Sequence, residues 1–399
     1  MRSTGAMTFR ILYHHRIRAD DGQGVHVREL IEALRRRGHE LKECALVPKT
    51  EPHLDASVPA RGAFWKSLRL PRIAVEAMEI LYNRKASSML AAAAKAMRPH
   101  VVYERHALHC RAGLDAARRL GIPLLLEVNS PMTDEVERLG LLRFPRSARA
   151  TERETLRGAD RVLAVTAVLG ERLVELGARR ESVVVIANGA QPERYGKSAS
   201  EGAAALRARW GLPSDAVVLG FVGFMRQWHR LEMAVDCLAQ PGFANARLVL
   251  VGEGPALPSL LQRARALSVQ DRVVSTGRVK GELIPAHVCA FDVALVPAIN
   301  SYASPLKLFD SMAAGVATIA PDQANLREIV EDGVHAALFQ ADDSLAFAKR
   351  LVTLVADRSL RQRIGKAAAA RVAERDLTWD GNAERVEAII RSLVPGGVA

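Results

Sequence analysis

Residues 300–330 of this 399-residue chain have the sequence NSYASPLKLFDSMAAGVATIAPDQANLREIV. Ser304 is a favoured N-cap and Pro305 suits the first helical position, so the pattern predicts a helix over 306–314 that ends at Gly315. A strand is expected to follow over 317–319. Free N–H groups and the helix dipole make the start of such a helix an anion site. Lys307 in its first turn is unfavourable for the helix itself, and an anion in front of the helix would account for it.

Lys307 and Asp310 are three residues apart and therefore lie on one helix face. A lysine for a phosphate and a carboxylate for a vicinal diol would together hold a sugar nucleotide. An i, i+3 surface ion pair on an ordinary helix is the alternative, and the segment alone does not decide between the two.

Short apolar runs alternate with amphipathic stretches on both sides of this segment. The pattern predicts strands over 9–13, 101–103, 123–128, 161–165, 182–186, 217–222, 247–251, 272–274, 293–296 and 317–319. Such alternation is typical of an α/β fold with parallel, doubly wound sheets. The small, polar stretch QPERYGKSASEGAAA (191–205) predicts a linker between two Rossmann-like halves.

Composition is that of an ordinary globular chain, with 49% hydrophobic and 25% charged residues. Four scattered cysteines form no C-x-x-C pair, which favours a reducing compartment and predicts no metal site. We expect a cytoplasmic protein, because no signal peptide and no apolar run of membrane-spanning length is present. Gly22-x-Gly24 and Gly252-x-Gly254 lack the third glycine of a dinucleotide fingerprint, so NAD is not expected.

The segment SPLKLFDSMAAGVATIA resembles the donor motif of the large retaining GT-B glycosyltransferase family (glycosyl transferases group 1, family 4 type). Further segments match that family in order along nearly the whole chain: GQGVHVRELIEALRRRGHEL, VIANGAQPERY, LGFVGFMRQWHRLEMAVDCLA, RLVLVGEGPALPSL and LTWDGNAERVEAII. The resemblance implies an acceptor domain over 1–190 and a donor domain over 206–375, which face each other across a cleft. A final helix within 376–399 would cross back to the first domain.

The resemblance also implies a donor site. The expected donor-binding residues are Gly24, Asn188, Gly223, Arg226, His229, Gly252, Gly254, Ser304, Pro305, Leu306, Lys307 and Asp310. Asp310 would bind the ribose hydroxyls, and a basic loop after 217–222 would bind the pyrophosphate. Two departures stand out. His229 takes the place of a lysine, which leaves a solvated loop as the alternative. Tyr302 replaces a glutamate that contacts the donor sugar.

The first half supplies acceptor candidates at the ends of its predicted strands, where ligands bind in open α/β sheets. Glu104 and Arg105 are candidates for catalysis, beside Arg226 and Lys307. Acceptor binding is expected from Gly22, His106, Glu127 and Asn129, with His109 as a further candidate. Each polar side chain has a structural alternative as a satisfied buried group.

Positive charge is concentrated in residues 1–200, which carry 34 Lys and Arg against 23 Asp and Glu. Two stretches mix aromatic or apolar residues with cations, at 64–72 and 139–149, and such mixtures favour an anionic membrane surface. A core-facing helix edge with a solvated basic face is the alternative. Nucleic acid is not expected, because no binding module is recognised.

These observations predict a retaining, metal-independent glycosyltransferase without a cofactor, using a UDP- or GDP-sugar. The expected acceptor is a lipid-linked or cell-surface polysaccharide precursor at the cytoplasmic membrane face, so the protein would be cytoplasmic or peripheral on the membrane. The alternatives are a soluble natural-product acceptor, a sugar-nucleotide epimerase of GT-B fold, and a non-catalytic subunit of a glycan-assembly complex.

Overall fold

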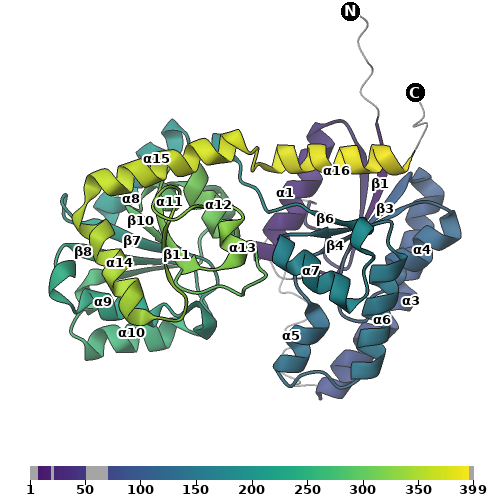
Figure 1. Ribbon diagram of the computed structural model, residues 1–399, viewed down its shortest axis with the longest axis horizontal. Helices are drawn as coiled ribbons and strands as arrows, with labels where there is room; N and C mark the ends of the chain where they lie inside the picture. The colour runs from purple at the N-terminus through teal and green to yellow at the C-terminus, as the bar shows by residue number, and fades with distance from the viewer. Residues whose placement is uncertain (1–7, 19–21, 51–70, 395–399) are drawn as a thin grey trace, which may run out of the picture. The chain divides into compact units, whose positions relative to one another are not determined.

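The computed structural model describes residues 8–18, 22–50 and 71–394, and the chain forms two compact units (Figure 1). The first unit comprises Met1–Ile186 with Asn382–Ala399, and the second comprises Ala187–Gly381. The sequence placed the corresponding boundaries at 190 and 376. The predicted basic stretch 64–72 lies outside the described residues, except for its last two positions.

The first unit is built on a parallel sheet of order β2-β1-β3-β4-β5-β6. Its strands are β1 (Arg10–His15), β2 (Glu40–Ala45), β3 (Val101–Arg105), β4 (Leu124–Val128), β5 (Arg161–Ala164) and β6 (Val183–Val185). Its helices are α1 (Gly22–Arg36), α3 (Arg72–Met97), α4 (Ala112–Leu120), α5 (Met132–Arg138), α6 (Pro145–Gly158) and α7 (Ala167–Leu176), with the 3-10 turn η1 (Arg180–Ser182).

The last helix, α16 (Trp379–Leu393), belongs to this unit from Asn382 onward. Glu387 accepts a hydrogen bond of 2.7 Å from Arg37 Nε, just beyond the end of α1, and its carboxylate lies 3.4 Å from His39 Nε2. These contacts hold the helix to the first unit.

The second unit repeats the architecture, with a parallel sheet of order β12-β11-β10-β7-β8-β9. Its strands are β7 (Val217–Val222), β8 (Ala246–Val251), β9 (Val273–Gly277), β10 (Val293–Leu295), β11 (Ala317–Asp322) and β12 (Ala337–Gln340). Its α-helices are α8 (Lys197–Arg209), α9 (Glu232–Leu238), α10 (Leu257–Ala266), α11 (Ile284–Cys289), α12 (Leu306–Ala313), α13 (Ala324–Arg327), α14 (Ser344–Ala356) and α15 (Arg358–Glu374). Short 3-10 turns are η2 (Pro192–Tyr195), η3 (Gln227–His229), η4 (Pro241–Phe243), η5 (Gln270–Arg272) and η6 (Gly281–Leu283).

The predicted α/β class and all ten predicted strands are confirmed. Strand β7 shows why the prediction succeeded, because its run VVLGFV is buried along nearly its whole length between helices. The two missed strands lie at sheet edges. In β2, ELKECA alternates exposed and buried positions, so it lacks the continuous apolar run of a central strand.

The predicted linker at 191–205 is wrong, since most of it forms η2 and α8. Ala199 and Ala203, one helical turn apart, are buried, and α8 packs on α11. A side chain at Gly202 would collide with Ala286. Small residues here permit close helix packing, and alanine is the best helix former, so a run rich in alanine did not indicate a loop.

The segment at Gly22–Gly24 resembles a glycine-rich loop of the family, but the structure places it in a helix. Both glycines belong to the first turn of α1, with Gly24 buried. No helix among the residues that the structure describes is both long enough and apolar enough to cross a membrane.

Candidate functional site

In the second sheet β7 and β10 are neighbours. From β7 the chain continues to β8 and β9 on one side, and from β10 it continues to β11 and β12 on the other side, so the winding direction changes between β7 and β10. Ligands of doubly wound sheets bind at this point, outside the carboxyl ends of the strands. Two segments meet there: the loop 223–229 after β7, and the start of α12 after β10. The predicted phosphate ligands lie on these two segments.

The loop 223–229 packs on the segment that follows β8 and forms hydrogen bonds with it. Met225 is fully buried, its N–H donates to Glu253 O at 2.8 Å, and its carbonyl accepts from Ala256 N–H at 3.1 Å. A side chain at Gly252 or Gly254 would collide with backbone of this loop, and both glycines have positive φ. These two predicted donor residues thus allow close packing that fixes the loop, which is a structural role.

Lys307 and His229 form the centre of the site. Lys307 Nζ lies 3.3 Å from His229 Nε2 and 4.2 Å from the centroid of the Phe221 ring. His229 Nδ1 accepts the Arg226 N–H at 3.1 Å, so in the neutral ring the proton sits on Nε2. A lysine ammonium is also only a donor. Two donors therefore face the same space, as they would around one anionic oxygen.

The electrostatics of this pair point the same way. Burial lowers the pKa of Lys307 to about 7. Burial, together with the positive charges of Lys307 and Arg226, lowers the pKa of His229 to about 2. Within the described residues no carboxylate is paired with Lys307, so the site holds a desolvated amine whose charged form an anionic ligand would stabilise.

Arg226 adds a second positive charge at the surface of the same loop. Its guanidinium is exposed and lies 5.0 Å from the centroid of the Phe224 ring. Phe224 and Trp228 are each 44% exposed, and Trp228 packs on the ring of His229. The buried and exposed residues of the loop thus separate into an anchoring side and a solvent side.

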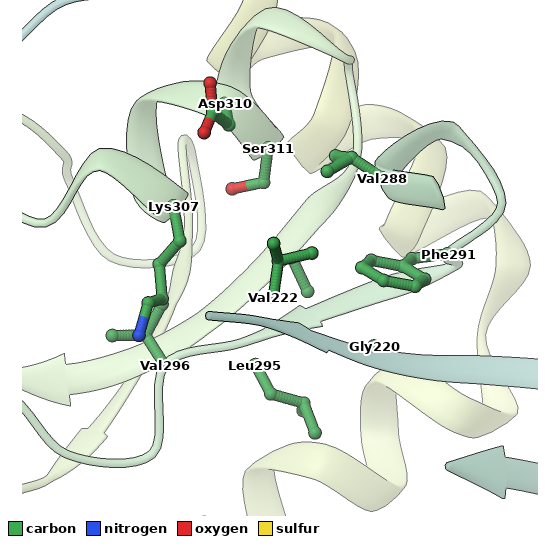
Figure 2. Close-up of a pocket in the computed structure, with 10 residues that line it drawn as sticks. Gly220, Val222, Val288, Phe291, Leu295, Val296, Lys307, Asp310 and Ser311 are labelled. Carbon is green, nitrogen blue, oxygen red and sulfur yellow. The ribbon is translucent and has the colours of Figure 1, made fainter. Parts of the chain in front are cut away.

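Asp310 points away from Lys307, although the two lie on one helix (Figure 2). Asp310 Oδ1 accepts a hydrogen bond of 2.6 Å from the hydroxyl of Tyr195 in η2. No ion pair joins Lys307 and Asp310, both of which the structure describes, so the alternative of an i, i+3 surface ion pair is wrong. The spacing in the sequence correctly predicted that both residues lie on one helix, but it did not predict the directions of their side chains.

A small pocket lies beneath α12, between this helix, α11 and the sheet (Figure 2). Its walls are mainly apolar, and Lys307, Asp310 and Ser311 border it. Phe291 covers Gly220 of β7 so closely that a side chain at that glycine would collide with the ring.

The start of α12 differs from the prediction. The N-cap is Pro305 and the helix begins at Leu306, whereas Ser304 makes no capping bond. Instead Ser304 Oγ accepts the Asn188 N–H at 3.1 Å, and Asn188 Nδ2 donates to Ser304 O. Gly189 passes so close to Thr378 that any side chain would collide with backbone. The predicted donor residue Asn188 therefore positions the turn that leads into α12.

Tyr302, in the place of the expected glutamate, lies in this turn. Its hydroxyl accepts a 3.1 Å hydrogen bond from Asn300 Nδ2. Asn325 Nδ2 donates to Ala303 O at 2.7 Å and to Asn300 O at 3.2 Å. The turn is thus held by side-chain amides, and an aromatic residue replaces the carboxylate.

In the first unit, the acceptor candidates separate into two buried networks. Glu127, at the end of β4, accepts from Tyr103 Oη at 2.6 Å and from Arg105, and lies 3.0 Å from His26 Nε2. Burial acts to raise the pKa of Glu127, but His26, Arg105 and these hydrogen bonds prevail and lower it to about 2. Arg105 and Glu127 therefore form a buried ion pair at the carboxyl end of the sheet.

Glu104 belongs to the other network, which faces α3 and α4. Its carboxylate is fully buried and accepts from His14 Nδ1 at 2.7 Å and from Gly113 N–H at 2.8 Å. Because successive strand residues point to opposite faces, Glu104 and Arg105 lie in separate networks on the two faces of the sheet, and their predicted catalytic roles stay a prediction. His14, Glu104 and Cys110 are close enough to share a metal ion, and their hydrogen bonds to one another and to nearby groups already account for the cluster.

The remaining acceptor candidates are also partly or fully buried. His106 Nε2 lies 3.3 Å from Glu152, and His109 Nε2 lies 2.8 Å from Glu76. His109 has a positive φ of 59°, which marks a tight turn. Asn129 has a buried side-chain oxygen without a hydrogen-bond partner, and the same holds for Nδ1 of His106 and Nδ1 of His109, so each of the three keeps a polar atom for a ligand.

Sequence reasoning missed Tyr195, Phe221 and His26. Tyr195 ends the quoted segment VIANGAQPERY, and a half-buried tyrosine hydroxyl needs a hydrogen-bond partner. The need for a hydrogen-bond partner was the one feature of the sequence that could have indicated a role for Tyr195. Phe221 had none, because a ring in a buried strand is ordinary.

Comparison with known proteins agrees with this geometry. Residues 21–189 match a glycosyl transferase 4-like domain, and residues 216–357 match the glycosyl transferases group 1. A D-inositol 3-phosphate glycosyltransferase of Xylanimonas cellulosilytica is 28% identical over 380 residues, covering 90% of this chain and 88% of the relative. A GDP-mannose-dependent alpha-mannosyltransferase of Mycobacterium tuberculosis is 29% identical over 304 residues, covering 76% and 75%.

Among solved structures, Anabaena HepE in complex with UDP has a TM-score of 0.69 at 17% identity, over 96% of this chain and 100% of HepE. That likeness shows the GT-B fold. The two matched halves, with relatives of one activity class, make the protein a member of the glycosyl transferases group 1 family and a nucleotide-sugar glycosyltransferase.

Proposed function

We propose that the protein transfers a sugar, with retention at the anomeric carbon, from a UDP- or GDP-sugar whose distal phosphate is bound between Lys307 and His229. One observation carries this proposal: the two side chains present donors to the same space, 3.3 Å apart, and the buried lysine has no carboxylate partner among the described residues. A diphosphate oxygen would satisfy both.

In the proposed reaction, the bond from the anomeric carbon to the diphosphate breaks, and an acceptor hydroxyl bonds to the same face of that carbon. The hydroxyl proton goes to the departing phosphate or to solvent. Lys307, Arg226 and the N–H groups at the start of α12 stabilise the developing negative charge. Since protein cations supply this charge, we propose that the reaction needs neither a metal ion nor a cofactor.

The choice of base rests on the names of similar proteins. The Mycobacterium tuberculosis relative is named for GDP-mannose, and HepE was crystallised with UDP. We therefore propose guanine or uracil. The test is a panel of UDP-, GDP- and TDP-sugars, scored by thermal shift and by nucleoside diphosphate release without acceptor. Release with a free sugar supports a transferase, whereas conversion of the sugar nucleotide into its epimer would support the epimerase alternative.

Asp310 is proposed to accept hydrogen bonds from the ribose. The expected result of Asp310→Asn is a donor KM raised by about 10- to 150-fold, since a hydrogen bond to a charged group contributes about 1.5–3 kcal/mol. Steady-state kinetics with a donor from the panel would check this. Asp322→Asn is the matched control, because Asp322 is paired with Arg327 at the surface of the same unit and its loss should leave KM unchanged.

We further propose that the acceptor is a lipid-linked or cell-surface polysaccharide precursor at a membrane face. Support comes from one surface of the first unit, formed by the first half of α3 and the segment 139–146, here called the α3 surface. Its exposed large apolar side chains are Ile73, Met78, Leu81, Leu139 and Leu141. Contiguous exposure of this kind marks an interaction site.

Hydrogen bonds join the two parts of the α3 surface. Arg72 Nε donates to Leu141 O at 2.9 Å, and Glu76 accepts the N–H groups of Arg143 and Phe144 at 2.6 and 2.8 Å. Figure 1 shows α3, α5 and α6 extending together beyond one end of the sheet. These helices extend beyond the carboxyl ends of the strands. His14, near the carboxyl end of β1, contacts Tyr82 midway along α3, and residues 73–81 of α3 lie beyond this contact.

Basic residues continue the α3 surface. At about 100° per residue, Ile73, Leu81 and Met78 span about 140° of the helix, and exposed Arg84 and Lys85 fall within the same sector. Exposed Arg143 and Arg146 lie on the adjoining segment. An apolar face continued by cations complements a bilayer with anionic headgroups.

Vesicle binding tests the membrane proposal. The chain should bind vesicles that contain phosphatidylglycerol, and binding should fade with salt, at about 1 kcal/mol per basic residue near the surface. Arg84→Glu with Lys85→Glu should abolish most of it in a cosedimentation assay. The same charge change at exposed Arg363 and Lys366 of α15 is the control and should have little effect. Equal binding to neutral vesicles, or none to either, would instead favour a soluble acceptor.

A further inference from the structure

Tyr195 and Asp310 form a contact that the phosphate site does not explain. Tyr195 comes from η2 and Asp310 from the middle of α12, and 2.6 Å separates the hydroxyl oxygen from Asp310 Oδ1. Both side chains are half-buried. The hydroxyl donates its only proton here, because the carboxylate is the acceptor of the pair.

The pKa shifts of the two groups favour a neutral Tyr195 hydroxyl that donates to Asp310. Burial raises the pKa of Asp310, while the Tyr195 hydrogen bond and the charge of Arg194 act to lower it. Burial and the charge of Asp310 raise the pKa of Tyr195 well above its usual value. Tyr195 therefore stays a neutral hydroxyl that donates to Asp310 Oδ1.

The ring of Tyr195 has a fixed position. It packs against a buried apolar cluster that includes Val218, Val288 and Phe291, on the face of the sheet that bears the pocket beneath α12. This packing and the hydrogen bond to Asp310 together position the hydroxyl oxygen. That oxygen donates to Asp310 and keeps a lone pair with which it can accept.

We propose that Tyr195 and Asp310 together form the receptor for the ribose diol, with the hydroxyl oxygen of Tyr195 accepting one ribose O–H and Asp310 Oδ2 accepting the other. This rests on the proposed function, in which Asp310 binds the ribose. A vicinal diol offers two O–H donors, and the carboxylate has one oxygen left for them. The phenol oxygen beside it supplies the second acceptor, which a phenylalanine would lack.

The experiment measures binding of UDP and GDP and of their 2′-deoxy and 3′-deoxy forms to the wild type and to Tyr195→Phe by titration calorimetry. The wild type should bind both deoxy forms more weakly than the ribonucleotide. Tyr195→Phe should lower ribonucleotide affinity by about 3- to 10-fold and should abolish the penalty for one deoxy form while keeping the other. Tyr82→Phe, which removes a buried hydroxyl in the first unit, should change none of these ratios.

Other outcomes overturn the proposal in distinguishable ways. An equal loss for all three nucleotide forms in Tyr195→Phe would make Tyr195 a structural support only, and an unchanged protein would remove it from the site; in both cases Asp310→Asn should still weaken binding. If Asp310→Asn also leaves both deoxy penalties intact, the ribose lies elsewhere and the proposed role of Asp310 fails with it. If the wild type binds no nucleotide, both proposals fall.

Discussion

Lys307→Met is expected to weaken nucleoside diphosphate binding by about 10- to 150-fold, because it removes a charge-assisted bond worth about 1.5–3 kcal/mol. Methionine keeps an apolar chain over the Phe221 ring, so the loss reports the charge. Titration calorimetry with UDP and GDP would measure it. Lys197→Met, at an exposed lysine of the same unit, is the control and should bind as the wild type does.

The same variant should be more stable without nucleotide, by about 0.5–2 kcal/mol, as expected where a binding site holds a costly group. Burial lowers the pKa of Lys307 from 10.5 to about 7. Below pH 7 the lysine is charged in both folded and unfolded states, so its cost to folding is complete, and it vanishes as pH rises toward 10.5. The gain in Lys307→Met, measured by urea unfolding, should therefore shrink between pH 7 and 10.

Lower stability of Lys307→Met at pH 7 would contradict this description of the lysine. It would mean that the ammonium is stabilised within the folded protein and is not waiting for an anion. Unchanged affinity for diphosphates in a folded variant would contradict its role in binding.

Glu127→Gln should have the largest effect on stability, a loss of about 3–5 kcal/mol, because it leaves Arg105 as an uncompensated buried charge. Glutamine has the same shape, so packing is preserved and the charge alone is removed. Urea unfolding of the first unit, followed by hydrogen exchange of its strands, would measure the loss. Glu137→Gln is the matched control, since it breaks a surface pair with Arg149 and should cost about 1 kcal/mol or less.

The Glu127 contribution also has a defined pH window. The folded pKa of about 2 lies below the ordinary value of 4.5, so the stabilisation is present above about pH 4.5 and is lost as pH falls toward 2. The stability difference between wild type and Glu127→Gln should narrow through that window. A difference that stays constant, or a variant as stable as the wild type, would show that Glu127 is not the charge partner of Arg105.

Much of the donor site could be predicted from sequence because its signals are local. Proline at the helix start, a lysine in the first turn and glycines after buried strands lie within a few residues of one another. Lys307 was found in this way, whereas Arg226 and His229 followed from the family resemblance, and the structure brings Lys307 and His229 into contact.

Side-chain direction and distant partners could not be predicted. Glu104 and Arg105 are adjacent, yet Glu104 faces α3 and α4 and Arg105 lies beside Glu127 on the other face. Only the register of β3 and β4 places Arg105 opposite Glu127. Asp310 was expected to bind the ribose, with an ion pair to Lys307 as the alternative, and its hydrogen-bond partner Tyr195, 115 residues away, was not predicted. Ser304 has the residue type of an N-cap. Its hydroxyl instead accepts a hydrogen bond from the N–H of Asn188, which lies far away in the sequence.

The central claim is that the Lys307–His229 pair holds the distal phosphate of the nucleotide. Its most direct test is the affinity ratio between nucleoside diphosphate and monophosphate, in the wild type and in Lys307→Met. The wild type should prefer the diphosphate strongly, and the variant should lose most of that preference while binding the monophosphate as well as before. An equal preference in both proteins would contradict the claim, since the distal phosphate would then be bound elsewhere.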